Sequence, residues 1–297
     1  MPSPEHEQVV AMLKNAPRSE GASPTLEEQR LGYDAMAALH PLADDIEVEQ
    51  TTADGVPADW VCAANADSGR ALLYFHGGGY VIGSRDSHRE LASRLSRAAE
   101  ARVLLIDYRL APESPFPAAL EDATKSYRWL LEQGFDPSRV AIGGDSAGGG
   151  LTISTLIALR DTGTAMPACG ICLSPWLDLV GTRASAQPGA VDDPMVTREA
   201  LETMASQYAP TQLDHPSVSP LYGDVVGLPP LLIQVGTREV LLDDSTRLAE
   251  KLDAAGVSFT LEAEDGLIHV WQHLAPNAPE SISAVERLGK FIQARTP

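Results

Sequence analysis

The sequence has few basic residues and no long apolar segment. Its 297 residues include 22 lysines and arginines against 41 acidic residues, which gives a formal net charge of −19. So negative a chain is poorly suited to nucleic acid or to anionic membrane surfaces, and we expect neither as a partner. No apolar run reaches the roughly 18 residues of a membrane-spanning helix. The N-terminal residues 1–7 are polar and acidic and lack the features of a signal peptide, so we expect a cytoplasmic protein.

Cysteine is also scarce, with Cys62, Cys169 and Cys172 the only three. The last two form a C-x-x-C pattern, which can serve redox or metal chemistry. They lie, however, in an apolar segment, 168–174, that is typical of a buried strand, where residues three apart point to opposite faces. No second cysteine pair supports a zinc site. We interpret them as core residues and expect neither a metal nor a cofactor.

From about residue 70 onward, short apolar segments alternate with helical patterns. This alternation predicts an α/β fold whose mostly parallel sheet has helices on both faces. Two earlier strand-like segments, 46–51 and 60–63, are joined by the hairpin signal Asp54-Gly55 and are expected to pair antiparallel at one end of an eight-stranded sheet. The other strands are expected at 71–75, 102–107, 139–143, 168–174, 230–235 and 257–263.

Two parts of the chain fall outside this alternation. Residues 1–44 contain the helical patterns 5–13 and 25–39, and the long connection between the strands ending at 174 and starting at 230 contains a third, 197–208. Insertions of this length in compact domains tend to be functional. We expect residues 1–44 and 176–218 to form a helical cap on a single domain that spans 1–297.

The segment Gly144-Asp145-Ser146-Ala147-Gly148 stands between a strand pattern, 139–143, and a helical pattern, 151–159. Small neighbours allow a strained turn that leaves the Ser146 oxygen exposed at its apex. The positive end of the following helix then faces any negative charge that forms there. Alone, the pattern also fits an ordinary Gly/Ser turn, but as a functional motif it indicates a nucleophilic serine.

A second motif strengthens this interpretation. His76-Gly77-Gly78-Gly79 follows the apolar strand pattern 71–75. Three consecutive glycines after a strand bring bare backbone N–H groups close to a ligand, as in the loop half of an oxyanion hole. The two motifs together predict acyl-transfer chemistry.

A serine nucleophile needs a histidine base, and in this fold the acid and then the histidine follow the serine in the chain. His269 is favoured because its loop leaves the carboxyl end of the last strand, where Ser146 is also expected. His273, four residues on, is an alternative. His215 falls in the expected cap, where a surface role fits better.

The acid is expected in the loop that leaves the strand 230–235. Glu239 lies in the loop proper, so it is favoured. Asp243 and Asp244 precede a helical pattern and have an ordinary role in capping that helix. Asp243 remains the alternative acid.

Four ordered motifs resemble those of the bacterial hormone-sensitive-lipase family of α/β-hydrolases. They are His76-Gly77-Gly78-Gly79, Asp107-Tyr108-Arg109-Leu110-Ala111-Pro112-Glu113, Gly144-Asp145-Ser146-Ala147-Gly148-Gly149 and Gly227-Leu228-Pro229-Pro230. The resemblance runs from about residue 70 to the end, and the N-terminal helices match more loosely. It implies an α/β-hydrolase fold with a cap, cofactor-free hydrolysis of carboxylic esters and frequent homodimerisation.

The resemblance also implies a role for individual residues. The catalytic set is Ser146, Glu239 and His269, and the oxyanion donors are the N–H groups of Gly78, Gly79 and Ala147. One position departs from the family pattern. The usual acid is aspartate with a second acidic residue four positions later, whereas here Glu239 holds the first place and Asp243 the second. The longer glutamate arm must therefore reach His269.

The substrate pocket is expected to be apolar, because the loops beside the motifs carry Tyr80, Trp176, Leu177 and Ile268. Core packing is an equal alternative for Leu177 and Ile268. The favoured function is hydrolysis of short to medium acyl esters. Lactone hydrolysis and amide deacetylation use the same groups, and a remote alternative is a ligand-binding receptor that does not catalyse.

The last expected strand, 257–263, alternates apolar and polar residues and contains neither proline nor lysine. A sheet edge without such protection invites pairing with a second chain. We therefore expect a two-fold homodimer through this strand, in agreement with the family resemblance.

Overall fold

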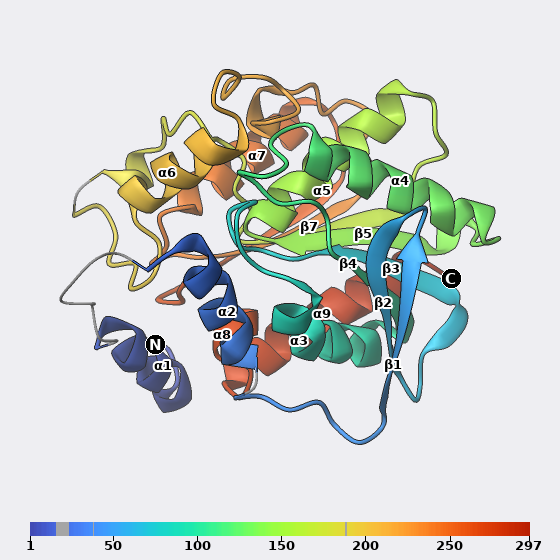
Figure 1. Cartoon of the computed structure of the whole chain (residues 1–297), viewed down its shortest axis with the longest axis horizontal. Coiled ribbons are helices and arrows are strands. Elements are labelled where there is room, and N and C mark those ends of the chain that lie inside the picture. Colours follow the sequence, from blue (N-terminus) through green and yellow to red (C-terminus); the bar gives the residue numbers. More distant parts are fainter. Residues whose placement is uncertain (16–23, 38, 188) are drawn as a thin grey trace.

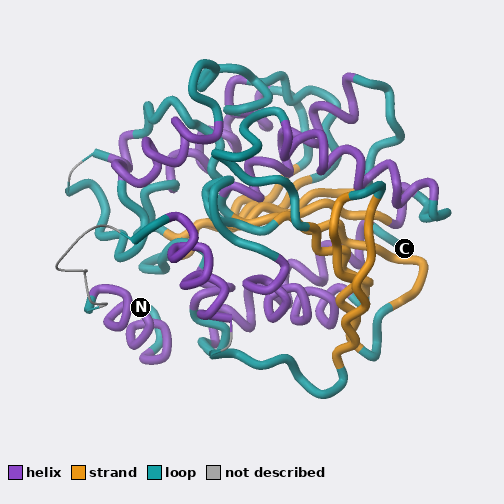
Figure 2. The backbone as a smooth tube through the Cα atoms, viewed as in Figure 1, coloured by secondary structure: helices purple, strands orange, loops and turns teal. Residues whose placement is uncertain are grey.

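The computed structural model describes residues 1–15, 24–37, 39–187 and 189–297, and it contains one eight-stranded sheet with helices on both faces (Figure 1, Figure 2). The strands lie side by side in the order β1-β2-β4-β3-β5-β6-β7-β8. They are β1 (Ile46–Ala53), β2 (Val56–Ala63), β3 (Asp67–Phe75), β4 (Ala101–Ile106), β5 (Val140–Asp145), β6 (Cys169–Leu173), β7 (Leu231–Gly236) and β8 (Phe259–Glu264).

The sheet is parallel except where β2 meets β1 and β4. The β1–β2 hairpin turns at Asp54 and Gly55, whose φ angles of 50° and 82° match the mirror-image turn that suits twisted strands. The eight expected strands and the antiparallel end are therefore confirmed. β2 and β3 begin earlier than expected, because residues 56–59 already pair with β1 and Asp67 pairs with Ala101 of β4.

Five long helices cover the sheet. Two of them lie on one face and three on the other (Figure 1). The first face carries α3 (Arg85–Ala99) and α9 (Pro279–Arg295), and the second carries α4 (Ala118–Glu132), α5 (Ala147–Asp161) and α7 (Leu242–Ala254). α3 and α9 bury leucines against the inner strands, and each buried leucine contributes about 1.5–3 kcal/mol to folding. Gly289 lets these two helices approach closely, since a Cβ there would lie 2.1 Å from the Ala98 carbonyl oxygen.

The C-x-x-C cysteines are part of this packing. Cys169 belongs to the apolar cluster under α3 and α9, and Cys172 belongs to the cluster on the opposite face. Both are free and buried. Burial raises the pKa of the Cys169 thiol to about 12, so it stays protonated. The two residues act as small apolar side chains, as the strand periodicity predicts.

Apart from the short α8 (Trp271–Leu274), three described helices lie outside these layers, at the edge of the sheet where the strand β5 ends: α1 (Pro4–Lys14), α2 (Leu26–Ala37) and α6 (Arg198–Tyr208) (Figure 1). α1 is held against α9 because the Ser3 hydroxyl donates to the Glu280 carboxylate at 2.8 Å. α2 is held by Arg30, which donates to the Val81 carbonyl at 2.9 Å and pairs with Glu113 at 2.8 Å. Parts of the expected cap, residues 16–23, 38 and 188, lie outside the described residues. Among the helices described, none is both long and apolar enough to cross a membrane.

Candidate active site

Ser146 occupies the sharp turn between β5 and α5. Its φ and ψ of 52° and −118° are unusual for a residue with a side chain, so the turn is strained. The Ser146 N–H donates to the Leu173 carbonyl at 2.8 Å, which holds the turn against β6. The motif glycine Gly148 is required by packing, because a Cβ there would lie 2.0 Å from the Phe75 carbonyl oxygen. The serine is thereby held in one position at the carboxyl end of β5.

The glycine-rich loop lies directly after β3, beside this turn. Gly78 and Gly79 have φ angles of 114° and 62°, which favour glycine. The Gly78 carbonyl accepts from the Ile82 N–H at 2.9 Å and closes the loop. Both glycines line the same cavity as Ser146. Ala147 is buried at the first position of α5, where a helix N–H has no partner within its own helix.

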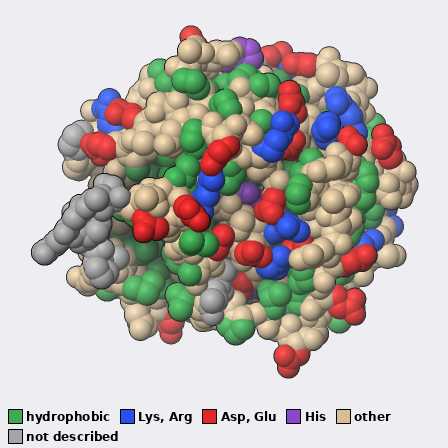
Figure 3. Space-filling model, in the orientation of Figure 1, with side chains coloured by type: hydrophobic (Ala, Val, Ile, Leu, Met, Phe, Trp, Pro, Cys, Tyr) green, Lys and Arg blue, Asp and Glu red, His purple; other side chains and the backbone are tan. Residues whose placement is uncertain are grey.

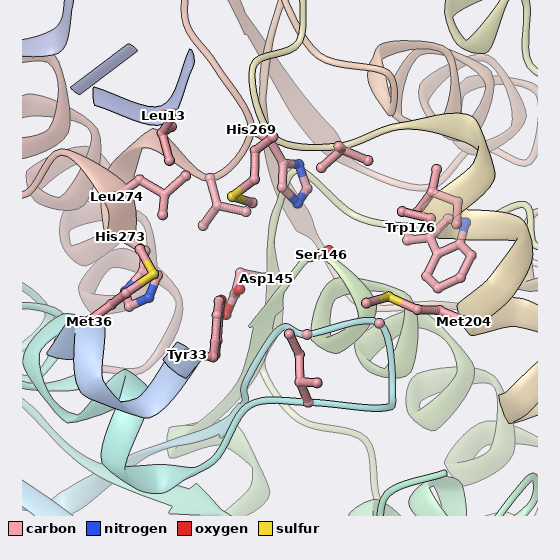
Figure 4. A pocket seen from close by; sticks show the side chains of 18 residues that line it. Leu13, Tyr33, Met36, Asp145, Ser146, Trp176, Met204, His269, His273 and Leu274 are labelled. Carbon is pink, nitrogen blue, oxygen red and sulfur yellow. The ribbon is translucent and has the colours of Figure 1, made fainter. Parts of the chain in front are cut away.

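His269 and Glu239 come from two further loops at the same edge of the sheet. His269 follows β8 and precedes the short helix α8 (Trp271–Leu274), and Glu239 follows β7. Glu239 Oε2 accepts from His269 Nδ1 at 2.8 Å, and both side chains are buried. His269 lines the cavity, and its ring points toward Ser146 (Figure 4). The structure thus brings together the three residues that the sequence places in one catalytic set.

Ser174 links the acid to the histidine loop and was not found from the sequence. Its hydroxyl donates to Glu239 Oε1 at 2.8 Å and accepts from the Val270 N–H at 3.1 Å. The Gly236 N–H also donates to Glu239 Oε1. These contacts hold one carboxylate oxygen in place and leave the other for His269. The only sequence signal is the position of Ser174 at the end of β6.

Glu239 also sets the basicity of the histidine. Burial alone would lower the pKa of His269, but the hydrogen bond from its ring to Glu239 and the negative charge of that carboxylate outweigh the burial. The pKa of His269 is therefore raised above its ordinary value of 6.5. A more basic imidazole is a better proton acceptor for a serine hydroxyl.

The alternative acids have other partners. Asp243 Oδ2 accepts from the Ser185 N–H at 2.8 Å. Asp244 is fully buried, pairs with Arg183 Nε at 2.6 Å and accepts from the Leu177 N–H at 2.7 Å. Both carboxylates therefore fasten the start of the long connection between β6 and β7 to α7.

The alternative histidines are also placed elsewhere. His273 stacks on His88 with ring centroids 4.5 Å apart and interplanar angle 8°. His215 is exposed, with its ring 5.5 Å from that of Phe116. Neither carries the contact to Glu239 that His269 makes.

The cavity above Ser146 has a volume of about 340 Å³. Its lining is mainly apolar and is drawn from α1, α2, α6 and the loops of the sheet edge; it includes Leu13, Tyr33, Met36, Trp176, Leu201 and Met204 (Figure 4). On the outside of the molecule, acidic and basic side chains are interspersed with apolar ones (Figure 3). The cavity therefore offers an apolar environment within a strongly charged protein.

Of the four residues expected to line the pocket, Trp176 does so. Tyr80 does not, because it stacks on Tyr208 at 3.8 Å and is buried behind the cavity wall. Leu177 and Ile268 are buried in apolar clusters, which is the core-packing alternative. The contributions of Tyr33 and Met36 were missed, since nothing in the sequence links α2 to the serine turn.

Comparison with known proteins identifies relatives of this chain. A family model described as the alpha/beta hydrolase fold matches residues 72–273. An acetyl-hydrolase from Streptomyces hygroscopicus is 46% identical over 91% of each chain. The crystal structure of an esterase from the bacterial hormone-sensitive lipase family has a TM-score of 0.95 and 47% identity, covering 100% of both chains. A hormone-sensitive lipase from a metagenome library has a TM-score of 0.94 and 36% identity over the same share of each chain.

The sheet, its helices and the family match define an α/β-hydrolase. Within that fold, the chain belongs to the hormone-sensitive-lipase family and is an enzyme of the carboxylesterase class. The family resemblance inferred from the four motifs is thereby confirmed.

Proposed function

We propose that this chain hydrolyses short to medium acyl esters through an acyl-enzyme formed on Ser146, with His269 as base and Glu239 as acid. The observation that carries the proposal is the 2.8 Å hydrogen bond between His269 Nδ1 and Glu239 Oε2, on a ring that points toward the strained serine in one cavity (Figure 4). Because the proton of His269 is on Nδ1 and is donated to Glu239, Nε2 carries the lone pair that can accept the proton of Ser146.

In the first half-reaction, the Ser146 oxygen attacks the ester carbonyl while His269 takes its proton. His269 then gives this proton to the alkoxide as the carbon–oxygen bond breaks and the alcohol leaves. In the second half-reaction, His269 takes a proton from water, which attacks the acyl carbon. His269 then returns this proton to the Ser146 oxygen as the bond between Ser146 and the acyl group breaks and the carboxylic acid leaves. Glu239 holds the imidazole in one tautomer and stabilises its positive charge in both halves.

The tetrahedral oxyanion receives the N–H groups of Gly78, Gly79 and Ala147. Gly78 and Gly79 belong to a loop closed by its own hydrogen bonds, and Ala147 belongs to the first turn of α5. Donors that are already in place need no reorganisation during the reaction, and each contributes about 3 kcal/mol to lowering the barrier.

The size and lining of the cavity favour acyl chains of about two to eight carbons, because it has about 340 Å³ and mostly apolar walls. A relative at 46% identity is an acetyl-hydrolase. A solved structure of EstE5, at 45% identity and a TM-score of 0.94, was soaked with p-nitrophenyl butyrate. We propose that α1, α2 and α6 act as the cap that sets this size limit.

The test is a chain-length series of p-nitrophenyl esters from acetate to palmitate, with and without EDTA. We expect the highest kcat/KM among the short esters and no effect of EDTA. If the enzyme prefers a lactone or an acetamide over every simple ester, the same three residues serve lactone hydrolysis or amide deacetylation instead. Activity on triolein far above that on butyrate esters would contradict the proposed size limit.

We also propose that two copies of the chain pair through β8. This strand lies at one edge of the sheet and pairs with β7 alone among the strands described. Arg287 of α9 pairs with Glu262 at 2.9 Å, which neutralises part of the charge on that edge. A strand edge without proline or lysine is suited to antiparallel pairing with its symmetry mate.

A further inference from the structure

The cavity has two walls of different character on either side of Ser146. Trp176 and Met204 lie on one side, and the other side holds Tyr33, Asp145 and His273 together with the apolar Leu13, Met36 and Leu274 (Figure 4). The three polar residues of this second side, named here the polar wall, belong to α2, the serine turn and α8. The reaction proposed above assigns no step to any of its three side chains.

His273 presents unused hydrogen-bonding capacity at this wall. Its Nδ1 is enclosed by protein, and neither ring nitrogen has a hydrogen-bond partner among the described residues, so Nε2 is the nitrogen available to the cavity. Burial, together with the neighbouring His88, lowers the pKa of His273 to about 3, so the ring is neutral at ordinary pH. A neutral imidazole has one donor and one acceptor, and Nε2 takes either role according to the tautomer.

Tyr33 lies beside this ring, with centroids 6.3 Å apart. Burial and the nearby Asp145 carboxylate raise the pKa of the Tyr33 phenol, so its hydroxyl stays protonated. Like the imidazole, a phenol both donates and accepts hydrogen bonds. The polar wall therefore offers two neutral groups, the phenol of Tyr33 and the imidazole of His273. Each suits a ligand group that can both donate and accept a hydrogen bond.

Asp145 does not need a cationic partner from a ligand. Its Oδ1 accepts from the Tyr74 hydroxyl at 3.0 Å, and its Oδ2 lies 3.3 Å from His88 Nε2. Burial opposes its ionisation, but His88 and these hydrogen bonds lower the pKa of Asp145 to about 2. A substrate carboxylate would be repelled by this charge. A neutral hydroxyl group, which both donates and accepts, complements the phenol and the imidazole of this wall.

We infer that the polar wall, through Tyr33 and His273, binds a hydroxyl group carried by the substrate near its ester bond. This inference rests on the proposed ester hydrolysis. Tyr33, Asp145 and His273 line the same cavity as Ser146, and Asp145 directly precedes Ser146 in the chain, so the wall lies on the substrate side of the nucleophile. The hydroxyl belongs either to the acyl part or to the alcohol part of the ester, while the other part occupies the wall of Trp176 and Met204.

Two matched pairs of esters separate these sources: methyl butyrate with methyl 3-hydroxybutyrate, and propyl acetate with 2-hydroxypropyl acetate. The measured quantity is the kcat/KM of the hydroxylated ester divided by that of the plain ester, determined by titration at constant pH. Tyr33→Phe removes only the hydroxyl, and His273→Phe removes both ring nitrogens but keeps a ring to stack on His88. Tyr222→Phe, at a residue outside the cavity lining, is the matched control.

We expect each wall variant to lower the ratio about fivefold in at least one pair, because one hydrogen bond is lost, whereas Tyr222→Phe should leave both ratios unchanged. The pair that responds identifies the side of the ester that carries the hydroxyl. Unchanged ratios in both pairs would overturn the inference and leave the wall as a site for water alone. If His273→Phe fails to fold, Tyr33→Phe decides, since it removes a single oxygen atom and keeps the ring. Wild-type enzyme inactive on all four esters would instead overturn the proposed function.

Discussion

Replacing Glu239 by glutamine tests the assignment of the acid most directly. The amide oxygen of glutamine can still accept from Ser174 Oγ and the Gly236 N–H, which in the wild type both donate to Glu239 Oε1. The amide nitrogen then faces His269 Nδ1. Because an amide nitrogen only donates, the imidazole must turn its lone pair to Nδ1 and carry its proton on Nε2. In that tautomer the ring cannot accept the proton of Ser146.

The size of the effect follows from this wrong tautomer. An amide in place of the orienting carboxylate lowers kcat by about 10⁴-fold in a catalytic set of this kind, which corresponds to about 5.4 kcal/mol of transition-state stabilisation. KM should change little, because Glu239 is fully buried and does not line the cavity. The assay is steady-state hydrolysis of p-nitrophenyl butyrate, with active sites counted by a fluorophosphonate.

Asp243→Asn is the matched control, since it makes the same chemical change four residues later. Asp243 accepts from the Ser185 N–H, and the amide oxygen of asparagine can still accept it, so this variant should lower the melting temperature by at most a few degrees and leave kcat within about threefold. The opposite outcome, near-normal kcat in Glu239→Gln and a collapse in Asp243→Asn, would refute the reasoning and make Asp243 the acid.

Three further predictions follow from the same structure. Ser146→Ala should lower kcat by about 10⁴-fold or more, and mass spectrometry of wild-type enzyme should find the fluorophosphonate on Ser146; a label on Ser174 would contradict the assignment. The pKa of His269 is raised and only the neutral ring accepts a proton, so kcat/KM should rise with pH through a midpoint above 6.5; a midpoint below it would count against the Glu239 contact. Light scattering should give a dimer that Phe259→Lys or Thr260→Pro converts to a monomer; a monomeric wild type would end the β8 hypothesis.

The sheet was predictable because its inner strands are short apolar runs separated by helical patterns. The same periodicity placed Cys169 and Cys172 on opposite faces of β6, where they lie. The starts of β2 and β3 were not predictable, since Pro57 and Asp59 interrupt the apolar pattern of β2, polar residues begin β3, and the length of both strands follows from pairing with their neighbours. The local sequence indicates well which residues are buried, but it indicates poorly which strands pair and where the pairing begins.

The candidate site was predictable where chain order and loop position constrain it, as for Ser146, Glu239 and His269. Ser174 and Tyr33 could not be found in this way, because their contacts come from segments far apart in the chain. Tyr80 was misplaced for a related reason. Its position beside the glycine loop suggests a pocket residue, but Tyr208 of α6 covers its ring at 3.8 Å. Such packing depends on how the long connection folds back.

The residues that form the cavity wall come from separate stretches of the chain. Leu13, Tyr33 and Met36 reach the nucleophile from helices that precede the family match, which begins at residue 72. The strands and loops that hold the reacting groups are all downstream. The cavity wall is therefore encoded in two stretches of the gene: one upstream of the reacting groups, and one among them that supplies Trp176, Leu201 and Met204. The upstream part is joined to the rest through a few contacts such as Ser3 to Glu280 and Arg30 to Glu113. Recombination upstream of the first motif would exchange that part of the wall and leave the reacting groups in place.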